Sequence, residues 1–180
     1  AAVVQMGDAL LLCTMCYGGE AEQSFFPLSV EYREKAFAAG KIPGGYFKRE
    51  AKPTDEEVLT SRLIDRPIRP MFPEGFMREV QVLATALSAD PENPVDVLGV
   101  SAASLAVGLS ELPFEEQVAA VRVIKSGDQY IVNPSYKQIE ESELEMVLAG
   151  TETSVTMVEG GAWEVPEAAV VKAIAIGHEE

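Results

Sequence analysis

The sequence predicts an α+β protein in which a mixed sheet packs against helices. Apolar and polar residues alternate in short segments that are separated by Gly- and Asn-containing turns, which is typical of β-hairpins. Capping sequences and Pro residues precede apolar segments and predict two or three helices among the strands. With 180 residues, of which 47% are hydrophobic and 24% charged, the chain has the composition of one globular domain.

The strands are located by alternation and by their turns. Residues 2–6 and 9–16 predict a hairpin that turns at Gly7-Asp8, because Gly accepts a positive φ. Residues 26–32 alternate, and Pro27 places this segment at a sheet edge or at the start of a strand. Further strands are expected at 79–90 and in two hairpins, 119–134 and 144–160, that turn at 126–128 and 151–153.

Three segments are candidates for these helices. Thr54 and Glu57 form a capping box, so a helix should begin there and run to about Arg66, after which Pro67 and Pro70 predict an extended exit. Asn93-Pro94 should place Pro at the first position of a second helix, whose many small residues allow close packing and predict burial. Pro166 is expected to open a last helix that continues to about Ile176.

The positive charge of this acidic chain is concentrated in one segment. The net charge is −15, yet residues 33–78 hold ten Lys or Arg against seven Asp or Glu and carry +3, whereas the remainder carries −18. Local positive charge in a negative protein predicts a confined site for an anion such as phosphate or a nucleic-acid backbone. The competing interpretation is a solvated face without a ligand.

Within this segment, residues 44–49 suit single-stranded RNA. Two glycines allow close backbone approach, and Tyr46-Phe47 places two rings directly before the cations Lys48 and Arg49. Bases can stack on the rings while phosphates bind the cations. The competing interpretation is that the two rings are loop residues packed against the core.

Arg62, Arg66 and Arg69 follow on the predicted helix at i, i+4 and i+7. Three guanidinium groups near one line match a phosphate track. Alternatively, Arg66 pairs with Asp65 or with the capping acids, and its neighbours do the same.

Other chemistries have weaker signals. Cys13 and Cys16 form C-x-x-C, but three residues apart on a strand point to opposite faces, which favours structural cysteines over a redox pair or a zinc site. Ser101 lies mid-helix in GVSAAS, which lacks the second Gly of a nucleophile elbow, and a triad would have to use His178, the one histidine. The glycines and lysines do not follow the order of a Walker A phosphate-binding loop. The sequence shows no signal peptide and no apolar run long enough to span a bilayer.

Long motifs resemble the polynucleotide phosphorylase family over nearly the whole chain. They include FFPLSVEYREKAFAAGKIPGGYFKRE, LTSRLIDRPIRPMFPEGF and VLAGTETSVTMVEG, in the order found in that family. The resemblance is to the first of the two ribonuclease PH-like halves and implies a ribosomal-protein-S5-like fold for residues 1–180. It further implies that this chain is a fragment, which lacks the first strand of the domain and ends within its last helix.

The resemblance also implies a function. The family degrades RNA from the 3′ end with phosphate, releases nucleoside diphosphates, uses Mg²⁺ and forms a trimeric ring. Its channel loop corresponds to Tyr46, Phe47, Lys48 and Arg49, with Tyr in place of the usual first Phe and Lys in place of the usual third Arg. Phosphate and metal bind in the second half, so this chain is expected to guide RNA without catalysing the reaction.

The expected partners are single-stranded RNA, two further copies in a homotrimer and RNA degradosome components, in the cytoplasm and without a membrane. Two alternatives stay open. The chain can be a stand-alone RNA-binding or scaffold subunit of an exosome-like ring. It can also be a metal or redox module built on Cys13 and Cys16.

Overall fold

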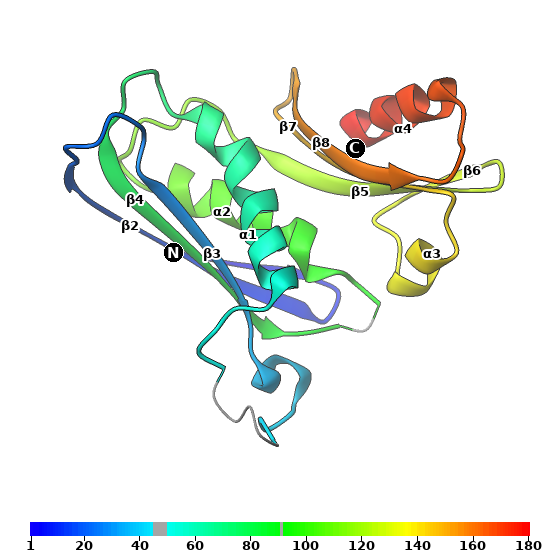
Figure 1. The fold of residues 1–180 in the computed structure, drawn as a ribbon, viewed down its shortest axis with the longest axis horizontal. Helices are drawn as coiled ribbons and strands as arrows, with labels where there is room; N and C mark the ends of the chain where they lie inside the picture. The colour runs from blue at the N-terminus through cyan, green and yellow to red at the C-terminus, as the bar shows by residue number, and fades with distance from the viewer. Residues whose placement is uncertain (45–49, 91) are drawn as a thin grey trace.

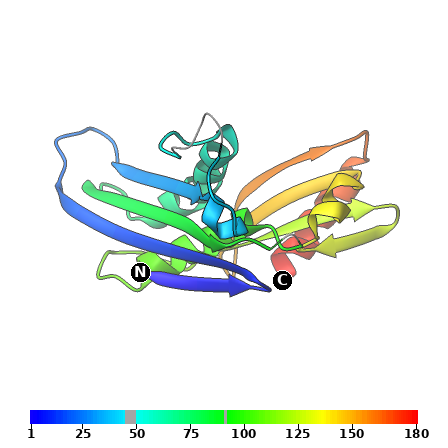
Figure 2. The same cartoon turned by 90° about the horizontal axis from the view of Figure 1, so that it is seen from below.

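The computed structural model describes residues 1–44, 50–90 and 92–180, and it forms four layers in the order sheet, helices, sheet, helix (Figures 1 and 2). Two helices fill the space between the sheets, and a third covers the outer face of the second sheet. The α+β class and the mixed sheet expected from the sequence are confirmed, with a second, antiparallel sheet in addition.

The first sheet has the strand order β1-β2-β4-β3. Its strands are β1 (Ala2–Met6), β2 (Ala9–Glu20), β3 (Leu28–Glu34) and β4 (Arg78–Ser88). The β1–β2 hairpin turns at Gly7, with φ of +59°, as predicted. Strand β3 pairs parallel with β4 and has no other neighbouring strand among the described residues, so the edge position that Pro27 indicated is confirmed.

The second sheet is antiparallel, with the order β6-β5-β7-β8. It consists of the two predicted hairpins, β5 (Ala119–Ser126) with β6 (Gln129–Val132), and β7 (Leu144–Gly150) with β8 (Val155–Ala162). Side chains of β7 alternate between two cores: Val147 and Ala149 belong to the large core, whereas Leu144, Met146 and Leu148 pack in the core under the last helix.

The helices are α1 (Asp55–Ile68), α2 (Val95–Gly108), the short α3 (Tyr136–Glu140) and α4 (Glu167–Glu179), with 3₁₀ turns at Ala36–Ala39 and Arg69–Met71. The extended exit predicted after Arg66 is wrong, because α1 continues through Pro67 and the 3₁₀ turn that follows contains Pro70. Proline has a helical φ and removes one hydrogen bond, and burial of Pro67 and Ile68 offsets that loss near the helix end.

Two other helix boundaries differ slightly from expectation. Pro94 is the N-cap of α2 rather than its first residue, and α4 runs three residues beyond Ile176. Close packing through small residues is confirmed, since a Cβ added at Gly99 would lie 2.7 Å from Cδ1 of Ile64 on α1. None of the described helices reaches the length and apolarity needed to cross a bilayer.

Candidate nucleic-acid interface

Helix α1 covers the free edge of β3 with polar side chains. The backbone N–H of Tyr32 donates to Oγ of Ser61 over 2.9 Å, and the N–H of Glu34 donates to Oε1 of Glu57 over 2.8 Å. An edge strand otherwise exposes unpaired amides. These two bonds therefore satisfy two amides of the edge and fix α1 alongside it.

The capping box that starts α1 is the same structure that fixes this edge. Oε2 of Glu57 accepts from the N–H of Thr54 over 2.7 Å, and Oγ1 of Thr54 accepts from the N–H of Glu57 over 3.1 Å. Glu57 is the one buried acidic residue in the described part of the chain, with 7% of its surface exposed. One carboxylate thus joins the start of the helix to the strand. The sequence predicted its role in the capping box but not its bond to β3.

Arg69 extends the edge cover to the beginning of β3. Its guanidinium donates to the carbonyls of Phe26 and Leu28 over 2.9 and 3.1 Å, and it forms a two-bond pair with Asp65 over 3.0 and 2.6 Å. It also lies over the ring of Phe26, 5.6 Å from the centroid. Internal contacts therefore occupy this guanidinium. This agrees with the alternative in which the arginines of the helix pair with nearby acids.

Arg66 has a different partner. Its Nη1 lies 2.5 Å from Oε2 of Glu159 on β8, and both side chains are about half exposed. The pair links α1 to the second sheet across the protein surface. Because both charges remain hydrated, such a pair contributes little to stability.

Arg62 is exposed, and among the described residues it takes part in no ion pair. It lines a hollow of about 410 Å³ between β3 and α1, which we call the β3–α1 hollow. Its wall residues are Val30, Glu31, Tyr32, Arg33, Pro53, Val58, Ser61, Arg62 and Asp65. The structure thus places Arg62 and Arg33 on the wall of one hollow. Helical spacing could not reveal Arg33, because it lies on a strand.

Tyr46, Phe47, Lys48 and Arg49 lie outside the described residues, so their predicted contact with RNA stays a prediction. The chain on either side of them is described. The N–H of Ala36 donates to Oε1 of Glu50 over 2.7 Å, and Nζ of Lys35 donates to the carbonyl of Glu50. Glu50, the first described residue after them, is therefore held beside the end of β3.

A second hollow, of about 270 Å³, lies where α1 and α2 meet the second sheet. Its acids are ion-paired: Arg122 lies 2.5 Å from Asp96 and 3.2 Å from Glu145, and Glu159 pairs with Arg66. Mg²⁺ is usually held through one or two carboxylates, and arginines already occupy the carboxylates of this hollow. Across the described ranges, no group of three or more His, Cys, Asp or Glu side chains is placed to hold a metal ion.

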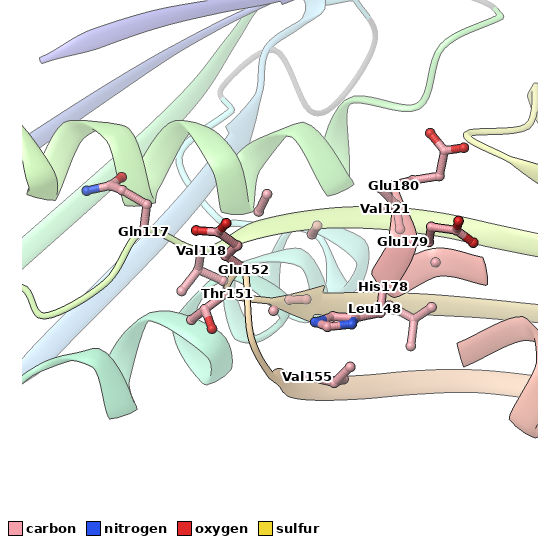
Figure 3. Close-up of a pocket in the computed structure, with 15 residues that line it drawn as sticks. Gln117, Val118, Val121, Leu148, Thr151, Glu152, Val155, His178, Glu179 and Glu180 are labelled. Carbon is pink, nitrogen blue, oxygen red and sulfur yellow. The ribbon is translucent and has the colours of Figure 1, made fainter. Parts of the chain in front are cut away.

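Figure 3 shows a pocket of about 380 Å³ with His178 and Glu179 at one end and Thr151 and Glu152 at the other. No Ser or Cys is among the residues that line it. Ser101 lies on α2, outside this pocket, as the mid-helix position predicted. The pocket therefore offers no pairing of a serine or cysteine nucleophile with this histidine.

The two cysteines point to opposite sides of β2, as predicted. Cys13 is buried, Cys16 is exposed, and both are free thiols. Burial raises the pKa of the Cys13 thiol to about 12, so this thiol stays protonated and unreactive near neutral pH. The arrangement favours structural cysteines over the redox or metal module.

Two family models cover the chain. The 3' exoribonuclease family, domain 1, matches residues 1–113, and domain 2 of the same family matches residues 116–180. The boundary falls between α2 and β5, where the chain passes from the first sheet to the second.

Among curated proteins, the polyribonucleotide nucleotidyltransferases of Solibacter usitatus and Hyphomonas neptunium are each 51% identical over 99% of this chain. That of Sulfurihydrogenibium sp. is 50% identical over all of it. The chain spans about a quarter of the length of these relatives, 26%, 25% and 26% respectively.

One similar solved structure is an Archaeoglobus fulgidus exosome with RNA bound to the active site. The match covers 98% of this chain and 78% of the exosome chain, with a TM-score of 0.71. At 17% identity this likeness concerns the fold alone. The two matched domains span both sheets and nearly the whole sequence, and the chain belongs to the 3′ exoribonuclease family.

Proposed function

We propose that this chain is the RNA-guiding, non-catalytic first half of a polyribonucleotide nucleotidyltransferase. The complete enzyme would degrade RNA from the 3′ end, with phosphate as the attacking group and nucleoside diphosphates as products. The observation that carries the proposal is about 50% identity, over the whole chain, to proteins of that name.

The arrangement of charges supports a guiding role. Ten of the fourteen Lys and Arg residues lie between Arg33 and Arg78, in a protein of net charge −15. RNA would be repelled by most of the surface and attracted to this segment. The proposed contacts are Tyr46, Phe47, Lys48 and Arg49 with Arg62; Arg66 and Arg69 are weaker candidates because both already form internal ion pairs.

The described donor groups support placing catalysis elsewhere in the full-length protein. Asp96, Glu145 and Glu159 face one hollow, but each is compensated by an arginine and is poorly suited to Mg²⁺. We therefore propose that Mg²⁺ and phosphate bind outside residues 1–180. We further propose a cytoplasmic homotrimer that binds single-stranded RNA and RNA degradosome components.

A second candidate is a scaffold or RNA-binding subunit of an exosome-like ring, a class of protein with which this chain shares its fold. The two proposals differ in the sequence expected downstream of this chain in its reading frame. A second ribonuclease PH-like half in the same frame supports the enzyme, and a stop codon without one supports the scaffold.

The test is phosphate-dependent RNA degradation. The full-length protein and the 180-residue segment are each incubated with a labelled single-stranded RNA, phosphate and Mg²⁺. The full-length protein should release nucleoside diphosphates, and the segment should release none above background. Phosphate-dependent release by the segment alone would show that the catalytic groups lie within it.

Substitutions in the predicted RNA loop, residues 46–49, should change RNA binding by the full-length protein in two distinguishable ways. Phe47→Ala should weaken RNA binding by about 1 to 3 kcal/mol through lost stacking and leave the salt dependence nearly unchanged. Lys48→Ala with Arg49→Ala should lower the slope of log affinity against log salt by about 0.7 for each lost phosphate contact. Affinity measured across a salt series distinguishes the two, and unchanged affinity in both would assign the loop a structural role.

A further inference from the structure

Strand β8 forms one edge of the second sheet (Figure 1). At the β3 edge, side chains of α1 bond the backbone, whereas in the described part of the chain no side chain bonds the backbone of residues 158–162 of β8. The N–H of Trp163 donates to the carbonyl of Glu143, which precedes β7, over 2.9 Å. Every second residue from there bonds to β7, so Gly160 and Ala162 direct their N–H and C=O groups to the free edge.

This edge lacks the usual protection against strand pairing. Edge strands in natural proteins are usually blunted by charged side chains, Pro, a bulge or a covering element. Residues 160–162 are Gly-Gly-Ala and all three are exposed. They carry no charge and no side chain large enough to hinder an approaching strand. The edge therefore suits the addition of an extended chain from another protein.

An exposed tryptophan follows this edge directly. Trp163 is 83% exposed, the largest exposed fraction among the described aromatic residues. It lines a hollow of about 270 Å³ together with Ser142, Glu143, Glu145, Gly161 and Ala162. Tryptophan is enriched among the residues that dominate protein interfaces, because it buries a large ring and keeps a polar N–H. The ring therefore offers an anchor beside the free edge.

The surroundings of the edge are acidic. Residues 138–171 contain eight Glu and no Lys, Arg or His. Three of these acids form ion pairs with bases of other segments, Arg66, Arg122 and Lys125. The other five are exposed and form no ion pair within the described ranges; they are Glu140, Glu141, Glu152, Glu164 and Glu167.

This charge selects the partner. A segment with Arg or Lys side chains complements the acids, and a guanidinium group also stacks favourably on an indole ring. A nucleic acid is repelled by the same acids. Glu141 and Glu164 are the unpaired acids nearest to the hollow in sequence, since each adjoins a residue that lines it.

We propose that the free edge of β8 and Trp163 form a docking site for an extended, basic segment of a partner protein. The segment adds a strand beside Gly160 and Ala162, and one of its cationic side chains stacks on Trp163. Others face Glu141 and Glu164. Backbone pairing supplies affinity, and the ring and the acids supply selectivity. This inference does not depend on the proposed function, because it requires no RNA.

The experiment measures binding of labelled peptides of about ten residues to the full-length protein by fluorescence anisotropy. The probe alternates Arg with Thr, which favours an extended conformation. One control peptide has the same sequence with every backbone nitrogen methylated, which keeps the charge and removes the N–H donors. A second control alternates Glu with Thr and reverses the charge. The Arg-Thr peptide should bind at least about tenfold more tightly than either control.

Variants of the protein locate the site. Trp163→Ala should weaken binding of the Arg-Thr peptide by about tenfold or more, as expected for an anchoring tryptophan. Glu141→Gln with Glu164→Gln should weaken it less and lower its salt dependence. The matched control is Phe25→Ala, which removes another ring that is 62% exposed and should change affinity by less than about twofold. Thermal denaturation checks that each variant is folded.

Several outcomes would overturn the proposal. Equal affinity for the Arg-Thr peptide and its methylated control would exclude strand addition, and failure of the parent to bind the Arg-Thr peptide would exclude the site. Equal peptide affinity of the parent and Trp163→Ala would exclude the anchor. If Trp163→Ala changes the oligomeric state in light scattering, the edge is an interface between copies of the chain. If it weakens binding of a single-stranded RNA instead of the peptide, the surface belongs to RNA.

Discussion

The edges of the two sheets on either side of α1 are treated differently. At β3, side chains of Glu57, Ser61 and Arg69 bond two backbone amides and two carbonyls of the edge segment. At β8, among the described residues, α1 contributes one exposed ion pair, Arg66 with Glu159. The comparison shows that polar residues on one helix divide into those that complete the fold and those that remain available for a ligand.

This division corrects a simple interpretation of helical spacing. Arg62, Arg66 and Arg69 have the spacing of a phosphate track, yet Arg69 is held by Asp65 and by the start of β3. Arg62 instead shares a hollow with Arg33. The local partner of each guanidinium, rather than the spacing of the three, therefore ranks them as candidates for the proposed RNA contact.

The largest expected effect is at the covered edge. Glu57→Ala should lower the free energy of unfolding by about 2 to 4 kcal/mol, because it leaves the amides of Glu34 and Thr54 without their acceptor. Glu56→Ala is the matched control: this exposed neighbour also lies in the first helical turn and should cost less than about 1 kcal/mol. Urea denaturation measures both, and equal losses would contradict the edge-covering role.

Arg69 and Arg66, the two ion-paired arginines of α1, allow the β3 edge to be compared directly with the β8 edge. Arg69→Gln should cost about 1 to 3 kcal/mol, since it removes contacts to Asp65 and to two strand carbonyls. Arg66→Gln removes an exposed pair and should cost less than about 1 kcal/mol. A larger loss for Arg66→Gln in urea denaturation would mean that the link between the sheets, rather than the β3 edge, stabilises the fold.

The smallest expected effect is a pH dependence at the β1–β2 turn. Hydrogen bonds from the N–H of Glu92, from Asn93 and from the N–H of Asp8 lower the pKa of Asp90 below its ordinary value of 3.8. A lowered folded-state pKa stabilises the protein above the ordinary value, and this contribution disappears as pH falls through the lowered one. Asp90→Asn should therefore be less stable than the parent at pH 7, with the difference shrinking below about pH 3.8 in urea denaturation. A difference that stays constant with pH would argue against these bonds.

Much of the fold could be predicted from local patterns. Alternation, Gly turns and the Thr54–Glu57 capping box located the strands and the start of α1, because these signals act within a few residues. The continuation of α1 through Pro67 could not be predicted this way, since burial against distant residues decides it. That Arg33 and Arg62 line one hollow could not be predicted for the same reason, because they are 29 residues apart and lie on different elements.

The most direct test of this division of roles measures two properties of two variants on the same helix. Arg62→Gln should leave the free energy of unfolding within about 0.5 kcal/mol of the parent and lower the slope of RNA affinity against salt by about 0.7. Arg69→Gln should lower stability and, where the protein remains folded, leave that slope unchanged. Loss of the salt slope in Arg69→Gln but not in Arg62→Gln would contradict the division, because the arginine that covers the edge of β3 would then be the one that contacts RNA.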